Sequence, residues 1–206
     1  MKITSILPVS DPRSILETVK TFQAGGLVVF PTDTVYGLAV PIANQAGIDL
    51  LFEVKGRDFN KAIAVLIGTQ QHLSQLTPAF PLNAKKLANK FWPGALTIVV
   101  TIRPGLPPNL SPYPTIGIRM PDHPFALDLL QKTGPLATTS ANISGGPNTI
   151  TAQQVLEQLD GKIDLLIDGG QTPGAVPSTV VDCTKPELAI LRLGSISEDD
   201  LIGALA

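Results

Sequence analysis

The sequence predicts an α/β fold. Strand-sized apolar runs alternate with segments of helical periodicity along most of the chain. Hydrophobic residues make up 44% of the 206 residues and charged residues only 16%, so we expect a sizeable core rather than disorder. The chain shows no internal repeat, no tract of low complexity and no clear linker. We therefore expect one domain, residues 1–206.

The first predicted helix lies between two predicted strands, at residues 2–7 and 27–30. Asp11 is the expected N-cap, Pro12 the first helical residue, and Gly25-Gly26 ends the helix. A helix that leads into a buried strand is typical of α/β proteins. The remaining predicted strands cover residues 62–67, 95–102, 115–119, 163–167, 178–182 and 188–193.

Further helices follow from apolar periodicity and from capping residues. Thr151 and Ser197 are the expected N-caps of the last two helices. The predicted helices after the first cover residues 44–54, 70–76, 82–91, 125–130, 151–159 and 197–205. Residues 171–177 are a predicted loop, and the proline-rich segment 103–114 is either a lid or a surface connection. Residues 31–38 are either a loop whose polar side chains face a crevice or a proline-initiated turn.

Composition narrows the functional classes. A net charge of -2 and a pI of about 5.6 do not indicate a strongly basic nucleic-acid module. Cys183 is the single cysteine, and the apolar run after Met1 is too short for a secretory leader. No run reaches the length of a membrane span, so we expect a cytoplasmic protein without membrane contact. His72, His123 and Cys183 do not cluster, and we expect no dedicated metal site.

The segment TTSANISGGP (138–147) concentrates four hydroxyl groups, an amide side chain and two glycines after a short apolar run. Such a segment can direct backbone N–H groups at an anion, as phosphate-binding turns do. A capped loop without a ligand explains the same composition and is the more common case. Alone, this segment leaves both interpretations open.

Cations and hydroxyl groups recur where predicted strands and helices end. This placement predicts one positively lined crevice for an anionic ligand, although solvated charges at such ends are also ordinary. The chain has neither a P-loop motif nor a nucleophile elbow. The residues concerned are Thr34, Lys55, Arg57, Lys61, Thr115, Arg119, Ser140, Asn142, Ser178 and Arg192.

Seven short motifs give the chain a family resemblance. They occur in the order PTDTVYGL (31–38), KGR (55–57), FWPG with LT (91–97), IRMP (118–121), SANISG (140–145), STVVD (178–182) and LRLG (191–194). In this order they resemble the YrdC-type threonylcarbamoyl-AMP synthases, whose signature joins KxR with SxN. The resemblance extends from Leu27 to Gly194 and is to the short, single-domain form. Asp58, Gly146 and Leu66 depart from residues that are common in that family.

The resemblance implies a YrdC-like fold, which is a twisted, open, mixed sheet flanked by helices, with one concave, positively charged site. It implies a nucleotidyltransferase that joins L-threonine, bicarbonate and ATP into threonylcarbamoyl-AMP and pyrophosphate. Mg²⁺ would accompany ATP. The product would pass to a threonylcarbamoyl-transferase machinery that modifies tRNA, and direct contact with tRNA stays open.

The resemblance also implies roles for individual residues. Lys55 and Arg57 would be catalytic, and Arg119 would bind the carboxylate of threonine. The implied ATP contacts are Lys55, Arg57, Lys61, Thr115, Ser140, Asn142, Asn148 and Arg192. The implied threonine contacts are Thr34, Arg119, Thr138 and Ser178.

Two other functions compete with this one. The same crevice could belong to a non-catalytic RNA-binding module, but only 5% of the residues are aromatic, and RNA readers commonly use stacking platforms. A divergent paralogue could run another carbamoyl chemistry on the same fold.

Overall fold

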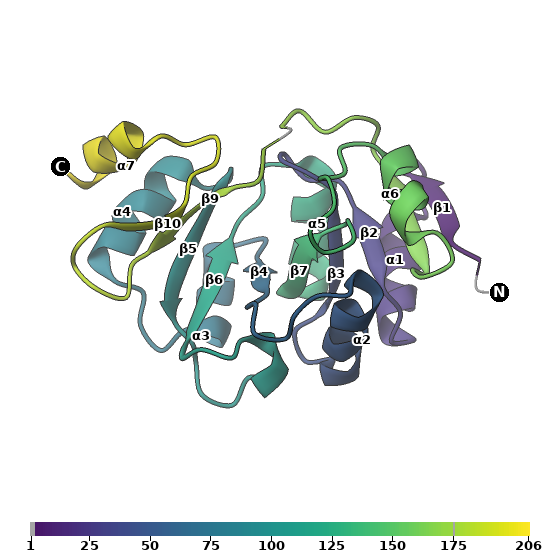
Figure 1. Cartoon of the computed structure of the whole chain (residues 1–206), viewed down its shortest axis with the longest axis horizontal. Coiled ribbons are helices and arrows are strands. Elements are labelled where there is room, and N and C mark those ends of the chain that lie inside the picture. Colours follow the sequence, from purple (N-terminus) through teal and green to yellow (C-terminus); the bar gives the residue numbers. More distant parts are fainter. Residues whose placement is uncertain (1–2, 175) are drawn as a thin grey trace.

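One mixed sheet runs through the computed structural model, which describes residues 3–174 and 176–206. Its ten strands follow the order β1-β8-β2-β3-β7-β4-β6-β5-β9-β10 (Figure 1). The β1–β8, β2–β8, β4–β6 and β5–β9 pairs are parallel, and the other neighbours are antiparallel. The strands are β1 (Ser5–Pro8), β2 (Val28–Phe30), β3 (Gly37–Pro41), β4 (Ala64–Leu66), β5 (Leu96–Thr101), β6 (Thr115–Arg119), β7 (Leu136–Ser140), β8 (Leu165–Asp168), β9 (Thr179–Asp182) and β10 (Ala189–Arg192).

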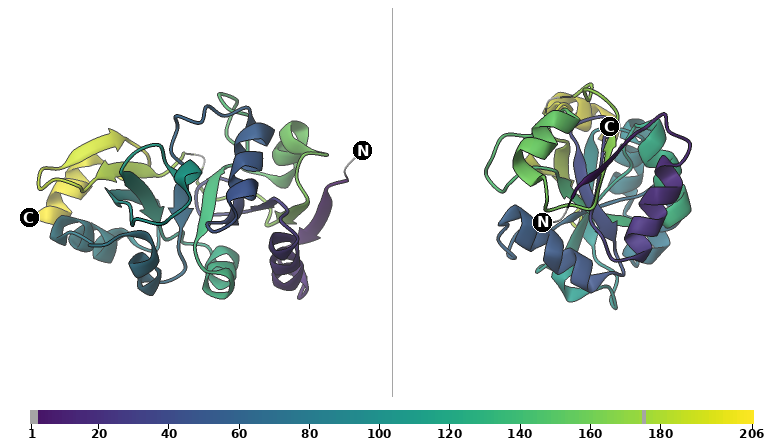
Figure 2. Two further views of the ribbon diagram at one scale, coloured as in Figure 1. Left: turned by 90° about the horizontal axis from the view of Figure 1, so that it is seen from below. Right: turned by 90° about the vertical axis from the view of Figure 1, so that its right-hand side faces the viewer.

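Helices lie on both sides of this sheet, with α1 and α5 on one side and α2 and α6 on the other (Figure 2). At the end of the sheet that carries β9 and β10, α7 packs on α4. The helices are α1 (Ser14–Gln23), α2 (Gln45–Lys55), α3 (Leu73–Leu76), α4 (Leu82–Phe91), α5 (Pro124–Thr133), α6 (Ala152–Leu159) and α7 (Glu198–Leu205), with 3₁₀ turns η1 (Gln70–His72) and η2 (Pro108–Leu110).

The segment that contains β2 shows how the sequence builds two cores. Successive side chains of a strand point to opposite faces of its sheet. Val28 and Phe30 enter a cluster with side chains of α1 and α5, whereas Leu27 and Val29 enter the larger cluster with those of α2 and α6. All four side chains are fully buried. Burial on both faces explains why this segment is continuously apolar instead of alternating.

Most predicted elements are confirmed. The predicted bounds of α4 and β6 agree with the structure. Thr151 caps α6 by accepting a hydrogen bond from the Gln154 amide, and Ser197 forms a capping box with Asp200 at the start of α7. Lys2, the predicted start of the first strand, lies outside the described residues, as does Ala175 of the predicted loop 171–177.

Three local predictions are wrong. Helix α1 begins at Ser14, because the Asp11 carboxylate binds the backbone amide and guanidinium of Arg13 instead of capping a helix from Pro12. Strand β3 was not predicted, and it covers part of the expected loop 31–38. The first three residues of the 138–147 segment, for which the sequence left a ligand-binding turn and a capped loop both open, belong to β7.

Near one edge of the sheet, β5 pairs with a strand that lies much later in the sequence. Strand β9 pairs in parallel with β5, from Leu96 opposite Thr179 to Val99 opposite Asp182. Strand β10 then forms the outer edge.

None of the helices formed by residues 3–174 and 176–206 combines the length and apolar character needed to cross a bilayer.

Candidate functional site

A cavity of about 420 Å³ lies over seven consecutive strands of the sheet, from β3 to β10. On β5 and β6, alternate residues line it, since side chains of one parity share a face of the sheet. On β6 these are Thr115, Gly117 and Arg119, and on β5 they are Thr97 and Val99. The cavity therefore gathers residues that lie far apart along the chain.

The cavity wall contains nine of the twelve predicted site residues. They are Thr34, Arg57, Thr115, Arg119, Thr138, Ser140, Asn148, Ser178 and Arg192. The other three, Lys55, Lys61 and Asn142, do not line it. Lys61 is exposed, whereas Lys55 and Asn142 are buried.

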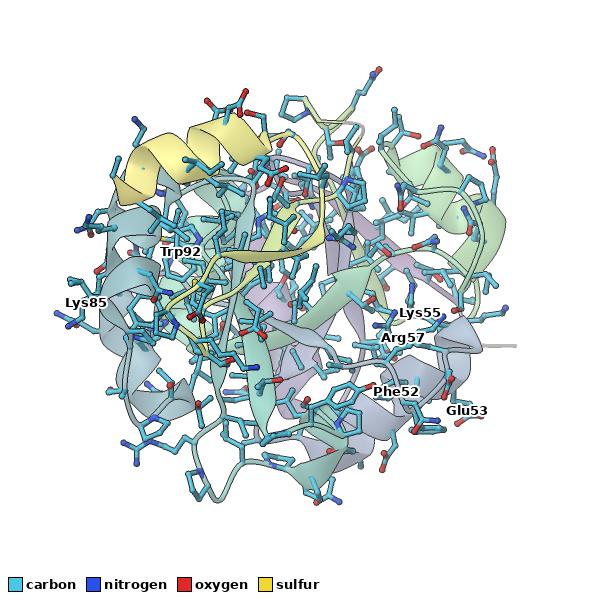
Figure 3. The ribbon with its side chains drawn as sticks, turned by 60° about the vertical axis from the view of Figure 1, so that its left-hand side comes forward. Phe52, Glu53, Lys55, Arg57, Lys85 and Trp92 are labelled. Carbon is cyan, nitrogen blue, oxygen red and sulfur yellow. The ribbon has the colours of Figure 1, made fainter. Side chains whose placement is uncertain are left out.

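The turn at Gly56 separates the side chains of Lys55 and Arg57. It caps α2 in the left-handed conformation, at φ 57°, and its amide and that of Arg57 satisfy the last carbonyl groups of the helix. Lys55 belongs to the helix and points inward, and Arg57 lies beyond the turn in the cavity wall. Figure 3 shows the two residues near each other at the end of α2. Of these two cations, only Arg57 therefore lines the cavity.

Lys55 holds the backbone of the segment that follows β7 by hydrogen bonds. Its side chain is 1% exposed, and its Nζ donates to the backbone oxygens of Ser140 and Asn142. The carbonyl oxygen of Lys55 accepts from the Ser144 amide at 2.8 Å. Burial, together with the nearby Arg57 guanidinium, lowers the pKa of Lys55 to about 7.

We expect Lys55 to make stability depend on pH. Between pH 7 and the ordinary lysine pKa of 10.5, the unfolded chain keeps a proton that folded Lys55 releases. The free energy of unfolding therefore rises with pH, by up to about 1.4 kcal/mol per pH unit from this group, with no slope below both pKa values. Urea unfolding at pH 7, 8 and 9 should show this slope in the wild type and lose it in Lys55→Met. An unchanged slope in the variant would refute the shift.

Hydrogen bonds, both within the segment that follows β7 and to residues outside it, hold this segment in place. The Oδ1 of Asn142 lies 2.5 Å from Ser140 Oγ, and its Nδ2 donates to the carbonyl oxygens of Ile143 and Gly146. Four backbone amides in the segment donate to protein acceptors instead of facing the cavity. They are those of Ala141, Ile143, Ser144 and Gly146. These four amides are therefore not available to an anion. Of the serine and the asparagine in the SxN motif, only Ser140 lines the cavity.

Three arginines make the cavity cationic. Arg57, Arg119 and Arg192 all line it, and burial lowers the pKa of each. The charge of Arg192 lowers the pKa of Arg57 and Arg119 further, so Arg192 repels both of the other guanidinium groups. An anion bound among the three arginines would offset that repulsion, so this arrangement suits an anionic ligand.

Arg119 is held in one orientation by three segments of the chain. Its Nε donates to Gly94 O at 2.9 Å, its Nη1 to Thr34 Oγ1 at 2.8 Å, and its Nη2 to Asp33 Oδ1 at 2.5 Å. A guanidinium has five N–H donors. Two remain, one on each Nη, and they can bind a carboxylate in the cavity through two hydrogen bonds.

For three residues that line this wall or contact it, the sequence predicts no role. Thr97 shares a hydrogen bond of 2.8 Å with Ser178, and Asp33 is the ion-pair partner of Arg119. Tyr36 also lines the cavity, and its hydroxyl donates to Gly170 O at 2.7 Å. Burial raises the pKa of Tyr36 to about 12, which keeps this donor protonated. Asp33 and Tyr36 lie in the PTDTVYGL motif, whose polar residues after a buried strand were the available signal.

No three His, Cys, Asp or Glu side chains are grouped to hold a metal ion in the part of the chain that the structure describes. The carboxylate of Asp33, which contacts the wall residue Arg119, is already in an ion pair with it.

The family model Sua5_yciO_yrdC, described as "Telomere recombination", matches residues 20–194. The threonylcarbamoyl-AMP synthase of Bacillus subtilis is 38% identical over 97% of this chain and 58% of its own length. A Mycobacterium tuberculosis relative named putative threonylcarbamoyl-AMP synthase is 36% identical over 98% of this chain and 96% of its own.

Solved structures give the same result. Pyrococcus abyssi Sua5 complexed with L-threonine is 34% identical and superposes with a TM-score of 0.92, over all of this chain and 61% of its own. Escherichia coli YciO, at 25% identity, superposes with a TM-score of 0.85 over 98% of this chain. The order of motifs, the mixed sheet and these matches agree, and the chain belongs to the Sua5/YciO/YrdC family.

Proposed function

We propose that this protein is a threonylcarbamoyl-AMP synthase, a nucleotidyltransferase that joins L-threonine, bicarbonate and ATP and releases pyrophosphate. The observation that supports it most is the cavity, which is lined by three arginines and several hydroxyl groups. Relatives with this name support it. The chain spans 58% of the Bacillus subtilis relative and 61% of the Pyrococcus abyssi structure, so the activity is proposed for the described chain on its own residues.

The threonine end of the proposed site is built around Arg119. Its two unused N–H groups would bind the amino-acid carboxylate, and the Thr34, Thr138 and Ser178 hydroxyl groups would surround the rest of the substrate. A pocket that hydrogen-bonds the substrate hydroxyl would discriminate against analogues that lack it, on the order of 10⁴-fold.

The ATP end is built around Arg57 and Arg192. As a carbamate oxygen attacks the α-phosphorus and pyrophosphate leaves, these cations would offset the charge on the phosphates. Thr115, Ser140 and Asn148 would supply polar contacts from the same wall. Mg²⁺ would arrive with ATP on the phosphate oxygens.

Lys55 has a different place in this proposal from the one that the sequence suggested. Its ammonium lies behind the wall, where it holds the segment that carries Ser140. We therefore propose that Lys55 supports the ATP site without touching the nucleotide. ATP contacts by Lys61 and Asn142 remain predictions from the sequence. So do a cytoplasmic location, contact with tRNA, and transfer of the product to a tRNA-modifying machinery.

Pyrophosphate release by the purified protein tests the function. We expect release from ATP when both L-threonine and bicarbonate are present, and none when either is omitted. Release that needs neither substrate would contradict the proposal. If no combination releases pyrophosphate, salt-dependent binding of tRNA that survives the double change Lys55→Ala and Arg57→Ala would favour an RNA-binding module.

A further inference from the structure

The loop after β8 holds the backbone of the loop that carries Thr34. We call residues 169–174 the β8 loop. The Tyr36 hydroxyl donates to Gly170 O and accepts from the Gly169 amide at 3.0 Å. Further along, the Gly174 amide donates to Asp33 O at 3.2 Å. The β8 loop thus contacts the 33–36 segment from its first residue to its last.

Thr172 is the central contact between these loops. Its side chain is 4% exposed, and its Oγ1 lies 3.0 Å from Thr34 O and 3.1 Å from Gly174 O. Its own amide donates to Ile150 O at 2.9 Å, which fixes the backbone from which the hydroxyl reaches. Because Thr172 is almost fully buried, water cannot easily replace this hydroxyl at the two carbonyl groups.

Gly174 lets the two backbones approach closely. A Cβ atom at this position would lie 2.8 Å from Asp33 O and 3.1 Å from Thr34 Cα. Both neighbours are backbone atoms, so no side-chain rotation can relieve the contact. Any residue larger than glycine would therefore push residues 33 and 34 away from their present positions.

The two residues held in this way are two of the three that orient Arg119, the third being Gly94. Thr34 Oγ1 accepts from its Nη1, and Asp33 Oδ1 from its Nη2. A shift of the 33–34 backbone would move both acceptors together and turn the guanidinium. We propose that Thr172 and Gly174 are positioning residues, which hold Thr34 and Arg119 in the orientation that binds the amino-acid substrate. The identity of that substrate rests on the proposed function, whereas the hydrogen bonds do not.

The test compares Thr172→Val with Thr172→Ser and with a matched control, Thr77→Val. Thr77 is also 4% exposed, and its hydroxyl also donates to a carbonyl oxygen two residues along, that of Ala79 at 2.7 Å, but it lies outside the cavity wall. We expect Thr172→Val to raise the KM for L-threonine about tenfold, with kcat and the KM for ATP within twofold. That change corresponds to about 1.4 kcal/mol, in the range of one hydrogen bond.

Thr172→Ser keeps the hydroxyl and should restore the wild-type KM, and Thr77→Val should leave both KM values unchanged. Gly174→Ala should act in the same direction as Thr172→Val, and it serves as a second variant if the valine protein does not fold. Equal increases in both KM values, or an unchanged KM for threonine in folded Thr172→Val and Gly174→Ala, would overturn the proposal.

Calorimetric titration with L-threonine in the absence of ATP separates this inference from the proposed function. A wild type that binds threonine but never releases pyrophosphate would contradict the synthase activity. Weaker threonine binding by Thr172→Val would still support the positioning role in that case. Wild-type affinity in Thr172→Val and Gly174→Ala would refute the role even if the enzyme is active, and a wild type that binds no threonine would refute both.

Discussion

We expect Arg57→Ala to lower the turnover of pyrophosphate release at least a hundredfold. Arg57 lies in the cavity wall, where burial and the charge of Arg192 lower its pKa, and an anion bound there would offset both effects. Removing one preorganised electrostatic donor commonly costs about 10²–10³ in turnover. The measurement is kcat under saturating ATP, L-threonine and bicarbonate.

The fold should survive this change. The guanidinium of Arg57 donates to two backbone oxygens, Ala62 O at 2.8 Å and Lys61 O at 3.4 Å, and it forms no ion pair within residues 3–174 and 176–206. Arg103 offers a matched control, because it is exposed and lies outside the cavity wall. Arg103→Ala should keep wild-type turnover. Turnover within threefold of wild type in Arg57→Ala would remove this residue from the chemistry.

The second large effect is expected at Arg119. Arg119→Lys should raise the KM for L-threonine about a hundredfold and change the KM for ATP by less than threefold. Lysine keeps a charge beside Asp33 but loses the planar fork, so the two N–H groups that remain for a carboxylate are lost. A hydrogen bond to a charged group contributes about 1.5–3 kcal/mol, and each 1.4 kcal/mol is tenfold in affinity.

Lysine is the better test because alanine would also unbalance the fold. The Asp33 side chain is only 13% exposed, and Arg119→Ala would leave its carboxylate without the ion pair that now holds it at 2.5 Å. Losing one partner of a buried pair costs about 3–5 kcal/mol of stability. Thermal unfolding of each variant therefore accompanies the kinetics. Equal increases of both KM values in folded Arg119→Lys would contradict a carboxylate role.

Prediction from the sequence succeeded where one strong local signal sufficed. Continuous apolar runs located β2 and β5, and proline with glycine ended α4 after Phe91. The sequence did not predict strand β3 because this strand begins with Gly37 and ends with Pro41, and both residue types are depleted in strands. Its pairing with β2 on one side and β7 on the other overrides that local preference.

The site was predictable in its membership more than in its geometry. The placement of cations at the ends of predicted elements, with the family resemblance, put Arg57 and Arg119 in one site, yet it could not separate the directions of Lys55 and Arg57. That separation depends on the left-handed conformation of Gly56 and on the carbonyl groups of the segment after β7. Thr172 carries no pattern of its own, since its role arises from contact with a residue 138 positions away.

The pairing of β5 with β9 has a consequence for biosynthesis. β5 reads LTIVVT, without charge or proline, and its partner on one side is made only when the ribosome reaches residues 179–182. Until then a nascent chain carries β5 as an unprotected edge of high β propensity, the kind of segment that recruits other chains into aggregates. Truncations that end before Ser178 should therefore accumulate in inclusion bodies or depend on chaperones, while the full-length chain covers this edge itself.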